Sequence, residues 1–308
     1  MTTLAGLVAR GMILVVVSVA VAACSTLAEK PLGSKERPIK MATVPFLETQ
    51  KLVAGMKSFG DYINKETGLF VEGDVPTSYV AVVEALCADK VDVAWVSPLA
   101  YVLARQKCGA DMQLASVNSQ GKTTYHGLII ARTASDIKDL GDLKGKRFAW
   151  VDPTSTSGYL YPRALLAQKG INPDKDLGQQ VAAGSHDKVV IAVMNNQVDA
   201  GAIYDDARTV KGVVDLFPKV GEETRVVGQT EEIPNDGVAF NKNMPPDTVK
   251  KVKDALIKLS STDEGKKVYK DALGTNGVAP TTDADYNPVR KAAQVLNLNV
   301  EEELKKLK

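Results

Sequence analysis

Four small hydroxyl residues stand in a row at positions 154–157, Thr-Ser-Thr-Ser, and Gly158 follows them. They lie between an apolar run at 146–151 and a helix-like segment from Tyr159, so they form a strand-to-helix turn. Such a turn presents unpaired backbone N–H groups and the positive end of the helix dipole, to which the hydroxyls add donors. The stretch therefore favours a pocket for a tetrahedral oxyanion, with Gly158 letting the backbone approach closely. Plain helix capping is the alternative, although one serine or threonine suffices for it.

A hydrolytic site is the other chemistry that these residue types allow. Ser155 or Ser157, together with His186 and Asp206, supply the residue types of a serine–histidine–aspartate triad. However, no G-x-S-x-G motif isolates one nucleophilic serine. With 2 histidines and 3 cysteines in the chain, a metal centre is also poorly supplied. We expect a binding protein rather than an enzyme, with no metal and no cofactor.

The N-terminal residues 1–23 have the features of a lipoprotein signal peptide. Arg10 precedes a short apolar stretch that ends in small residues and is too short for a comfortable transmembrane helix. The sequence VAAC at 21–24 predicts lipidation of Cys24, with an ordinary signal peptide as the alternative. Residues 24–37 are polar and contain proline and glycine, which predicts a tether. We expect an exported protein anchored by its lipid, facing the periplasm or the cell exterior.

Two further cysteines, Cys87 and Cys108, remain in the mature chain. Outside the cytoplasm an even pair usually forms a disulfide. Each lies towards the end of one of two consecutive predicted helices, and neighbouring helices on one sheet face could bring them together. We expect a structural disulfide, and two free buried thiols are the alternative.

The charges of the chain balance, with 38 Lys+Arg against 37 Asp+Glu and a formal net charge of +1. A nucleic-acid partner needs a concentrated basic face, and nothing in this composition suggests one. Selectivity for an anion must therefore come from a local site rather than from the field of the whole molecule.

Strands and helices alternate along the mature chain, which predicts parallel pairing with helical crossovers and hence an α/β fold. We expect one lobe from 38–133 and 234–308 and a second from 134–233, with crossing strands near 127–133 and 234–241. A cleft between two such lobes is a usual place for a small ligand. Strands are predicted at 39–44, 70–76, 91–96, 112–118, 126–132, 146–151, 198–204, 223–230 and 236–241. Helices are predicted at 49–68, 78–90, 98–109, from 159, at 188–197, 246–260, 263–273 and 286–308.

Several of these segments together resemble one known family. They are DPTSTSGYLYP at 152–162, AGSHDKVVIAVMNNQVDAGA at 183–202, KVDVAWVSPLAYVLA at 90–104 and DLKGKRFAWVDP at 142–153. With them, the chain resembles the phosphate-, phosphite- and phosphonate-binding proteins of ABC importers, from about residue 39 to 280. The resemblance implies the type II periplasmic-binding-protein fold, in which two α/β lobes clamp the ligand.

The resemblance also implies a set of ligand contacts. Ser155, Thr156 and Ser157 match residues that hold the phosphonyl oxygens, and His186 matches a histidine that reaches the same oxygens. That histidine donates when neutral and adds charge when protonated. Tyr79 and Tyr125 match contacts from the first lobe, although either could be a packing residue. Asp206 and Asp236 match acids that face the ammonium of aminoalkylphosphonates, with Asp205 an alternative to Asp206. We expect Trp95 and Trp150 to be core residues rather than ligand platforms.

The function implied by the resemblance is capture of a phosphorus oxyanion outside the cytoplasm and delivery to a permease and ATPase complex. The two acids incline us to an organophosphonate with a cationic tail, with phosphite and phosphate left open. A lipoprotein that senses an oxyanion for a membrane kinase is the main alternative.

Overall fold

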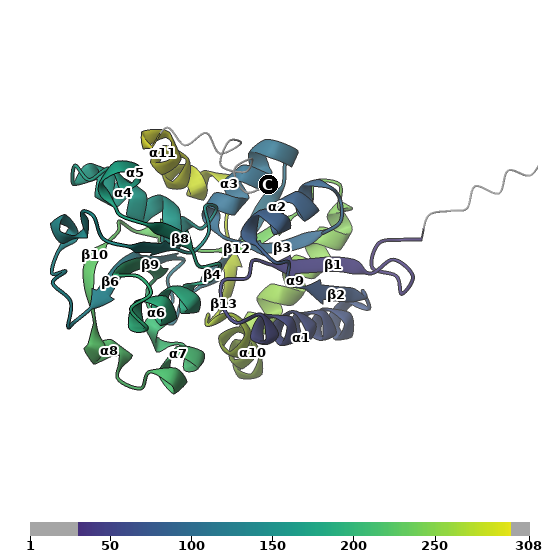
Figure 1. The fold of residues 1–308 in the computed structure, drawn as a ribbon. Helices are drawn as coiled ribbons and strands as arrows, with labels where there is room; N and C mark the ends of the chain where they lie inside the picture. The colour runs from purple at the N-terminus through teal and green to yellow at the C-terminus, as the bar shows by residue number, and fades with distance from the viewer. Residues whose placement is uncertain (1–29, 297–308) are drawn as a thin grey trace, which may run out of the picture. The chain divides into compact units, whose positions relative to one another are not determined.

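The computed structural model describes residues 30–296, and its first sheet has six strands in the order β13-β4-β12-β3-β1-β2 (Figure 1). Strands β1, β2 and β3 pair in parallel, as the alternation predicts. Strand β12 instead runs antiparallel to β3 and β4, and β13 runs antiparallel to β4, so the sheet is mixed. The strands are β1 (Ile39–Thr43), β2 (Val71–Asp74), β3 (Val93–Val96), β4 (Asp111–Val117), β12 (Gly237–Phe240) and β13 (Gly277–Pro280).

Both faces of this sheet are covered by helices, as β3 illustrates. Val93 and Trp95 belong to a buried cluster with residues of α1, α9 and α10, whereas Ala94 and Val96 belong to a cluster with residues of α2 and α3. Successive strand side chains point to opposite faces, which explains why β3 is apolar throughout. Figure 1 shows α1 and α10 on one side and α2 and α3 on the other. The helices are α1 (Thr49–Thr67), α2 (Tyr79–Cys87), α3 (Pro98–Cys108), α9 (Pro246–Ser260) and α10 (Asp263–Leu273).

The second sheet has five strands in the order β10-β6-β9-β7-β8. Strand β7 is parallel to β8 and β9, and β6 is antiparallel to β9 and β10. The strands are β6 (Gly127–Arg132), β7 (Phe148–Trp150), β8 (Gln180–Ala182), β9 (Ala200–Tyr204) and β10 (Thr224–Gln229). Its helices are α4 (Tyr161–Gln168), α5 (Pro173–Asp176), α6 (His186–Met194), α7 (Lys211–Leu216) and α8 (Val220–Glu223).

The chain passes through a short two-stranded ribbon each time it crosses from one sheet to the other. Strand β5 (Thr124–Tyr125) precedes β6 of the second sheet, and its partner β11 (Ile233–Pro234) precedes β12 of the first. Strand β6 pairs with β9 and β10, although the sequence analysis assigned residues up to 133 to the first lobe. We therefore propose that the lobes divide at the β5–β11 ribbon. The last helix, α11 (Asn287–Val295), contacts α3 of the first lobe and α4 of the second.

The edge strands β8 and β13 were not predicted from the sequence. Strand β8 has three residues, of which Val181 is 38% exposed, so it lacks the apolar alternation that marks a longer strand. Strand β13 has four residues and ends at Pro280, and proline is a residue that weakens the prediction of a strand.

The N-terminal predictions fall largely outside the described part of the chain. The signal peptide at 1–23 and the lipidation site Cys24 lie outside it. Residues 31–37, predicted as part of the tether, form turns that are bound to the first lobe. The Gly33 carbonyl accepts a hydrogen bond from the Phe70 N–H at 2.8 Å, and Leu32 packs on the first-lobe core. Among the helices from residue 30 to 296, none is long and apolar enough to cross a membrane.

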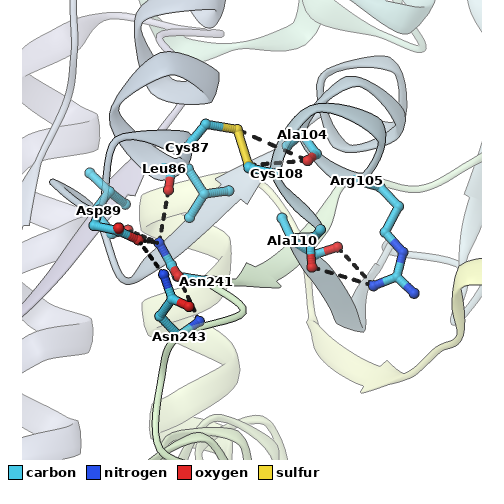
Figure 2. The surroundings of a disulfide bond; sticks show 11 residues. Leu86, Cys87, Asp89, Ala104, Arg105, Cys108, Ala110, Asn241 and Asn243 are labelled. Carbon is cyan, nitrogen blue, oxygen red and sulfur yellow. Dashed lines mark hydrogen bonds between the residues drawn. A yellow bond between two sulfur atoms is a disulfide. The ribbon is translucent and has the colours of Figure 1, made fainter.

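A disulfide joins Cys87, the last residue of α2, to Cys108, the last residue of α3 (Figure 2). Their Cα atoms are 5.3 Å apart. Beside it, the Asn241 amide donates to the Leu86 carbonyl at 2.8 Å and to the Asp89 carboxylate at 2.9 Å. The C-terminal ends of α2 and α3 are thus linked covalently, and the end of α2 is also held to the residue that follows β12.

Reduction of this disulfide is expected to lower the free energy of unfolding by about 3 kcal/mol, because it frees a loop of about 20 residues in the unfolded chain. Urea unfolding of the mature protein with and without reductant measures the difference. The double variant Cys87→Ser/Cys108→Ser is the control, expected to be less stable and insensitive to reductant. Equal stability of oxidised and reduced protein would contradict a structural role.

Candidate oxyanion-binding site

A pocket of about 120 Å³ lies at the edge where strands of both sheets end. Strand β12 runs antiparallel to β3 and β4, so its N-terminal end lies beside their C-terminal ends. The segments that follow β1, β3 and β4 line the pocket from the first lobe, with the residues that precede β12. The turn after β7, the first residue of α6 and the end of β9 line it from the second lobe. This is the edge at which open α/β sheets generally bind ligands.

Ser155 and Ser157 line the pocket from the turn after β7, and they are only 1% and 2% exposed. Residues 156–160 form a π-helical turn that continues directly into α4, and the first N–H groups of a helix lack acceptors within it. Ser155 is also the N-cap, since its Oγ accepts from the Gly158 N–H at 3.1 Å. Capping and pocket lining therefore coincide in Ser155.

The other two hydroxyls of this cluster face away from the pocket. The Thr156 hydroxyl accepts a hydrogen bond from the Leu99 N–H of α3 at 2.8 Å, and Thr156 is not part of the pocket wall. The prediction of Thr156 as a ligand contact is therefore not supported by its position. The Thr154 hydroxyl donates to the Asp152 carboxylate at 2.7 Å. Gly158 serves packing rather than a ligand, because a Cβ there would lie 2.4 Å from Cγ2 of Val151.

His186, the first residue of α6, lines the pocket and is buried. Its Nδ1 accepts a hydrogen bond from the Tyr204 backbone N–H at 2.9 Å, so the neutral ring carries its proton on Nε2. Burial lowers the pKa of His186 to about 3, which keeps the ring neutral at physiological pH. His186 can therefore offer one N–H donor but not the positive charge that the sequence analysis considered.

Tyr79 at the start of α2 and Tyr125 in β5 both line the pocket. Tyr79 shares a hydrogen bond with Ser155, and Tyr125 shares one with Ser157. Burial raises the pKa of both phenols well above the usual value, so both remain neutral hydroxyls. The two tyrosines thus bring first-lobe hydroxyls to the two serines of the second lobe.

Two carboxylates line the pocket, those of Asp205 and Asp236. Asp236 is partly accessible through the pocket but closely surrounded by protein, and this burial raises its pKa to about 7. The Tyr125 hydroxyl lies 3.5 Å from Asp236 Oδ1. Asp205 is exposed at the rim. Asp206, the predicted contact, instead forms an ion pair with Arg208 and accepts its backbone N–H at 3.0 Å, so Asp205 takes the position in the pocket.

The polar groups of the pocket do not include the serine–histidine–aspartate triad considered from the sequence. No lysine or arginine occurs among the described residues that line it. The His186 Nδ1 accepts from a backbone N–H, and Asp206 is paired with Arg208, so the considered triad of Ser155, His186 and Asp206 is not assembled. What remains is a set of neutral hydroxyl, imidazole and backbone donors, together with two carboxylates.

Trp95 lines the pocket, although its place at the end of an apolar strand predicts a core residue. It does both, since its ring packs against Phe59 and Tyr269, and its Nε1–H donates to Ser116 Oγ at 3.0 Å. Other wall residues were not predicted, and each lies within a few residues of a strand end at this edge. They include Phe46, Ser97, Ser116, Asn118, Tyr204 and Asn235. The position of strand ends was the available signal for them.

Comparison with known proteins places the chain among binding proteins. Residues 41–286 match the family model described as ABC transporter, phosphonate, periplasmic substrate-binding protein. The chain is 30% identical to the phosphate-import protein PhnD of Mycolicibacterium smegmatis over 89% of this chain and 94% of that protein.

Solved structures are similar as well. A binding protein component of an ABC phosphonate transporter from Pseudomonas aeruginosa has a TM-score of 0.77 at 25% identity, covering 90% of this chain and 93% of that one. PhnD1 of Prochlorococcus marinus, in complex with methylphosphonate, has a TM-score of 0.72 at 20% identity, covering 84% and 98%. These likenesses confirm the two-lobed type II periplasmic-binding-protein fold.

Ser157→Ala is expected to weaken binding of phosphate or methylphosphonate by about 1.5–3 kcal/mol, because it removes a buried donor to a charged acceptor. Titration calorimetry of the mature protein measures this loss. Ser135→Ala is the matched control, since the Ser135 hydroxyl donates to the Arg132 carbonyl at 2.7 Å and lies outside the pocket wall. If Ser157→Ala and Ser135→Ala both bind as tightly as the wild type, the anion is held elsewhere.

Proposed function

The chain belongs to the family of periplasmic substrate-binding proteins of phosphonate ABC transporters, and we propose that its pocket captures a tetrahedral phosphorus oxyanion. The observation that carries this proposal is the pair of buried serines, Ser155 and Ser157, beside the neutral His186. Hydroxyls, an imidazole N–H and helix N-terminal N–H groups all donate, and several of them can reach the oxygens of one anion.

The size of the pocket is compatible with this ligand class. Its volume of about 120 Å³ is several times the roughly 10–15 Å³ that one water-sized group requires, so it can hold a phosphorus oxyanion together with a short organic substituent.

The charges around the pocket favour a ligand with its own cation. Two carboxylates, Asp205 and Asp236, face a space without lysine or arginine among its described lining residues. A doubly charged phosphorus oxyanion is repelled by these carboxylates, and the low effective dielectric of the pocket strengthens the repulsion. An ammonium group on the ligand offsets it. Asp236, buried beside Tyr125, is the proposed ammonium partner, and Asp205 at the rim is the second. We therefore favour an aminoalkylphosphonate.

Inorganic phosphate is the second candidate, and the pKa of Asp236 favours it. A carboxyl with a pKa of about 7 is substantially protonated near neutral pH and can donate a hydrogen bond to a P–O group. The name of the M. smegmatis relative, a phosphate-import protein, points the same way. A phosphate that accepts a hydrogen bond from the protonated carboxyl and an ammonium that pairs with the ionised one require opposite protonation states of Asp236, and pH separates these two modes of binding.

Transport is the proposed use of this binding. Delivery to a permease and ATPase complex follows from the family, and anchoring through a lipid on Cys24 is proposed from the sequence VAAC. A sensor that feeds a membrane kinase would share the pocket. Genes for a permease and an ATPase beside this one would support import, and a gene for a histidine kinase would support sensing.

The pH dependence of binding tests which ligand the pocket prefers. An ammonium ligand binds ionised Asp236, so its affinity is expected to fall roughly tenfold per pH unit below pH 7. A ligand that accepts a hydrogen bond from protonated Asp236 weakens instead as the pH rises above 7. Calorimetry from pH 5.5 to 8.5 with 2-aminoethylphosphonate, methylphosphonate, phosphite and phosphate measures both trends.

Asp236→Asn is the control for this series. The protonation of the ligand itself affects its binding to the wild type and to Asp236→Asn equally, so it cancels when one affinity is divided by the other. We expect the wild type to prefer 2-aminoethylphosphonate and to lose that preference at low pH and in Asp236→Asn. Tighter binding of phosphite or methylphosphonate, unchanged in Asp236→Asn, would rule out the ammonium partner.

A further inference from the structure

Besides the contacts of Ser155 and Ser157 with the two pocket tyrosines, the turn after β7 forms three polar contacts with the N-termini of α2 and α3, here called the turn–helix contacts. The Asp152 carboxylate faces the backbone N–H of Tyr79, which stabilises its charged form. The Thr154 carbonyl accepts the Ser97 hydroxyl at 2.9 Å. The Thr156 hydroxyl accepts the Leu99 N–H at 2.8 Å. All three acceptors belong to the second lobe and all three donors to the first, so these bonds exist only while the lobes are together.

The donors of the turn–helix contacts lie at the N-termini of two helices. Tyr79 is the first residue of α2, Ser97 is the N-cap of α3 and Leu99 is its second residue. The first N–H groups of a helix have no acceptor within it, and the dipole there favours an anionic partner such as Asp152. Asp152 and Thr156 are 7% and 1% exposed, so these bonds form away from water. When the lobes part, water can satisfy the same groups.

The acceptors of these contacts are separate from the pocket. Asp152, Thr154 and Thr156 are absent from the described residues of its wall, whereas Ser155 and Ser157, adjacent in the sequence, line it. Alternate residues of one turn therefore face two different surfaces. Ser155 and Ser157 line the pocket, whereas the Thr154 carbonyl and the Thr156 hydroxyl face the N-terminus of α3.

We propose that Asp152, Thr154 and Thr156 are positioning residues that hold the lobes closed and set the affinity for every ligand by a common factor. This inference rests on the proposed function of the pocket. If a ligand is held only between closed lobes, the apparent dissociation constant equals the intrinsic one divided by the closed fraction. A change that destabilises only the closed form therefore weakens all ligands equally. Loss of a pocket hydroxyl weakens them unequally, because ligands differ in the oxygens they present.

The test compares Thr156→Val with Ser157→Ala, using calorimetry with phosphate, phosphite, methylphosphonate and 2-aminoethylphosphonate. Valine keeps the shape of threonine but leaves the Leu99 N–H without its acceptor in the closed form. We expect Thr156→Val to weaken every ligand that binds the wild type by the same factor, about three- to tenfold. Ser157→Ala is expected to change the ratios between ligands.

Two further variants control this comparison. Thr156→Ser keeps the acceptor oxygen and is expected to restore wild-type affinity. Thr224→Val removes another buried hydroxyl, one that donates to the Val220 carbonyl at 2.6 Å within the second lobe, and is expected to leave affinity unchanged. If Thr156→Val does not fold, Asp152→Asn carries the same test, because it removes the charge at the N-terminus of α2.

Unequal factors for Thr156→Val that follow the pattern of Ser157→Ala would overturn the inference, because they would place Thr156 in contact with the ligand. Unchanged affinities for a folded Thr156→Val protein would overturn it as well. Failure of the wild type to bind any of the four probes would overturn the proposed function and this inference together. If the wild type binds a probe and Thr156→Val gives either of these two results, only this inference is overturned and the proposed function stands.

Discussion

The titratable donors of the pocket, His186, Tyr79 and Tyr125, are kept neutral by burial, and the rest of the account depends on this. Burial lowers the pKa of His186 and raises those of Tyr79 and Tyr125, and no lysine or arginine occurs among the described lining residues. A cationic side chain enclosed without its partner costs several kcal/mol in lost hydration. Neutral hydroxyl and N–H groups cost less and exchange readily with water. Such a pocket suits a protein that must both take up and release an anion.

The fold brings these donors together through the ends of its elements. Strand ends of both sheets meet at one edge, and helices α2, α3 and α6 begin there with Tyr79, Pro98 and His186. At the opposite end, α2 and α3 are joined by the Cys87–Cys108 disulfide. Helices α2 and α3 are thus joined to each other at their C-terminal ends, and their N-terminal ends contact the turn after β7 of the second lobe. The same pair of helices therefore carries both the disulfide and the turn–helix contacts.

Strand and helix periodicity predicted the two-lobed α/β fold, and the 154–157 cluster, also a local pattern, predicted a site at a turn where the structure has a pocket. The sequence did not predict directions of side chains. The Thr156 hydroxyl is directed to the Leu99 N–H rather than into the pocket, and Asp206 pairs with Arg208 whereas its neighbour Asp205 lines the pocket. The neutral state of His186 and the raised pKa of Asp236 come from burial by distant segments. Short edge strands such as β8 carry too few residues for a pattern.

The most direct test of the central claim is a crystal structure of the mature protein with the tightest-binding of the four phosphorus ligands. The account predicts that the phosphorus atom lies between the lobes, with its oxygens within hydrogen-bonding distance of the Ser155 and Ser157 hydroxyls and of His186 Nε2. It also predicts that no lysine or arginine side chain contacts the phosphoryl group. A phosphorus atom bound to a cationic side chain, or outside this pocket, would contradict the claim that neutral donors hold the ligand.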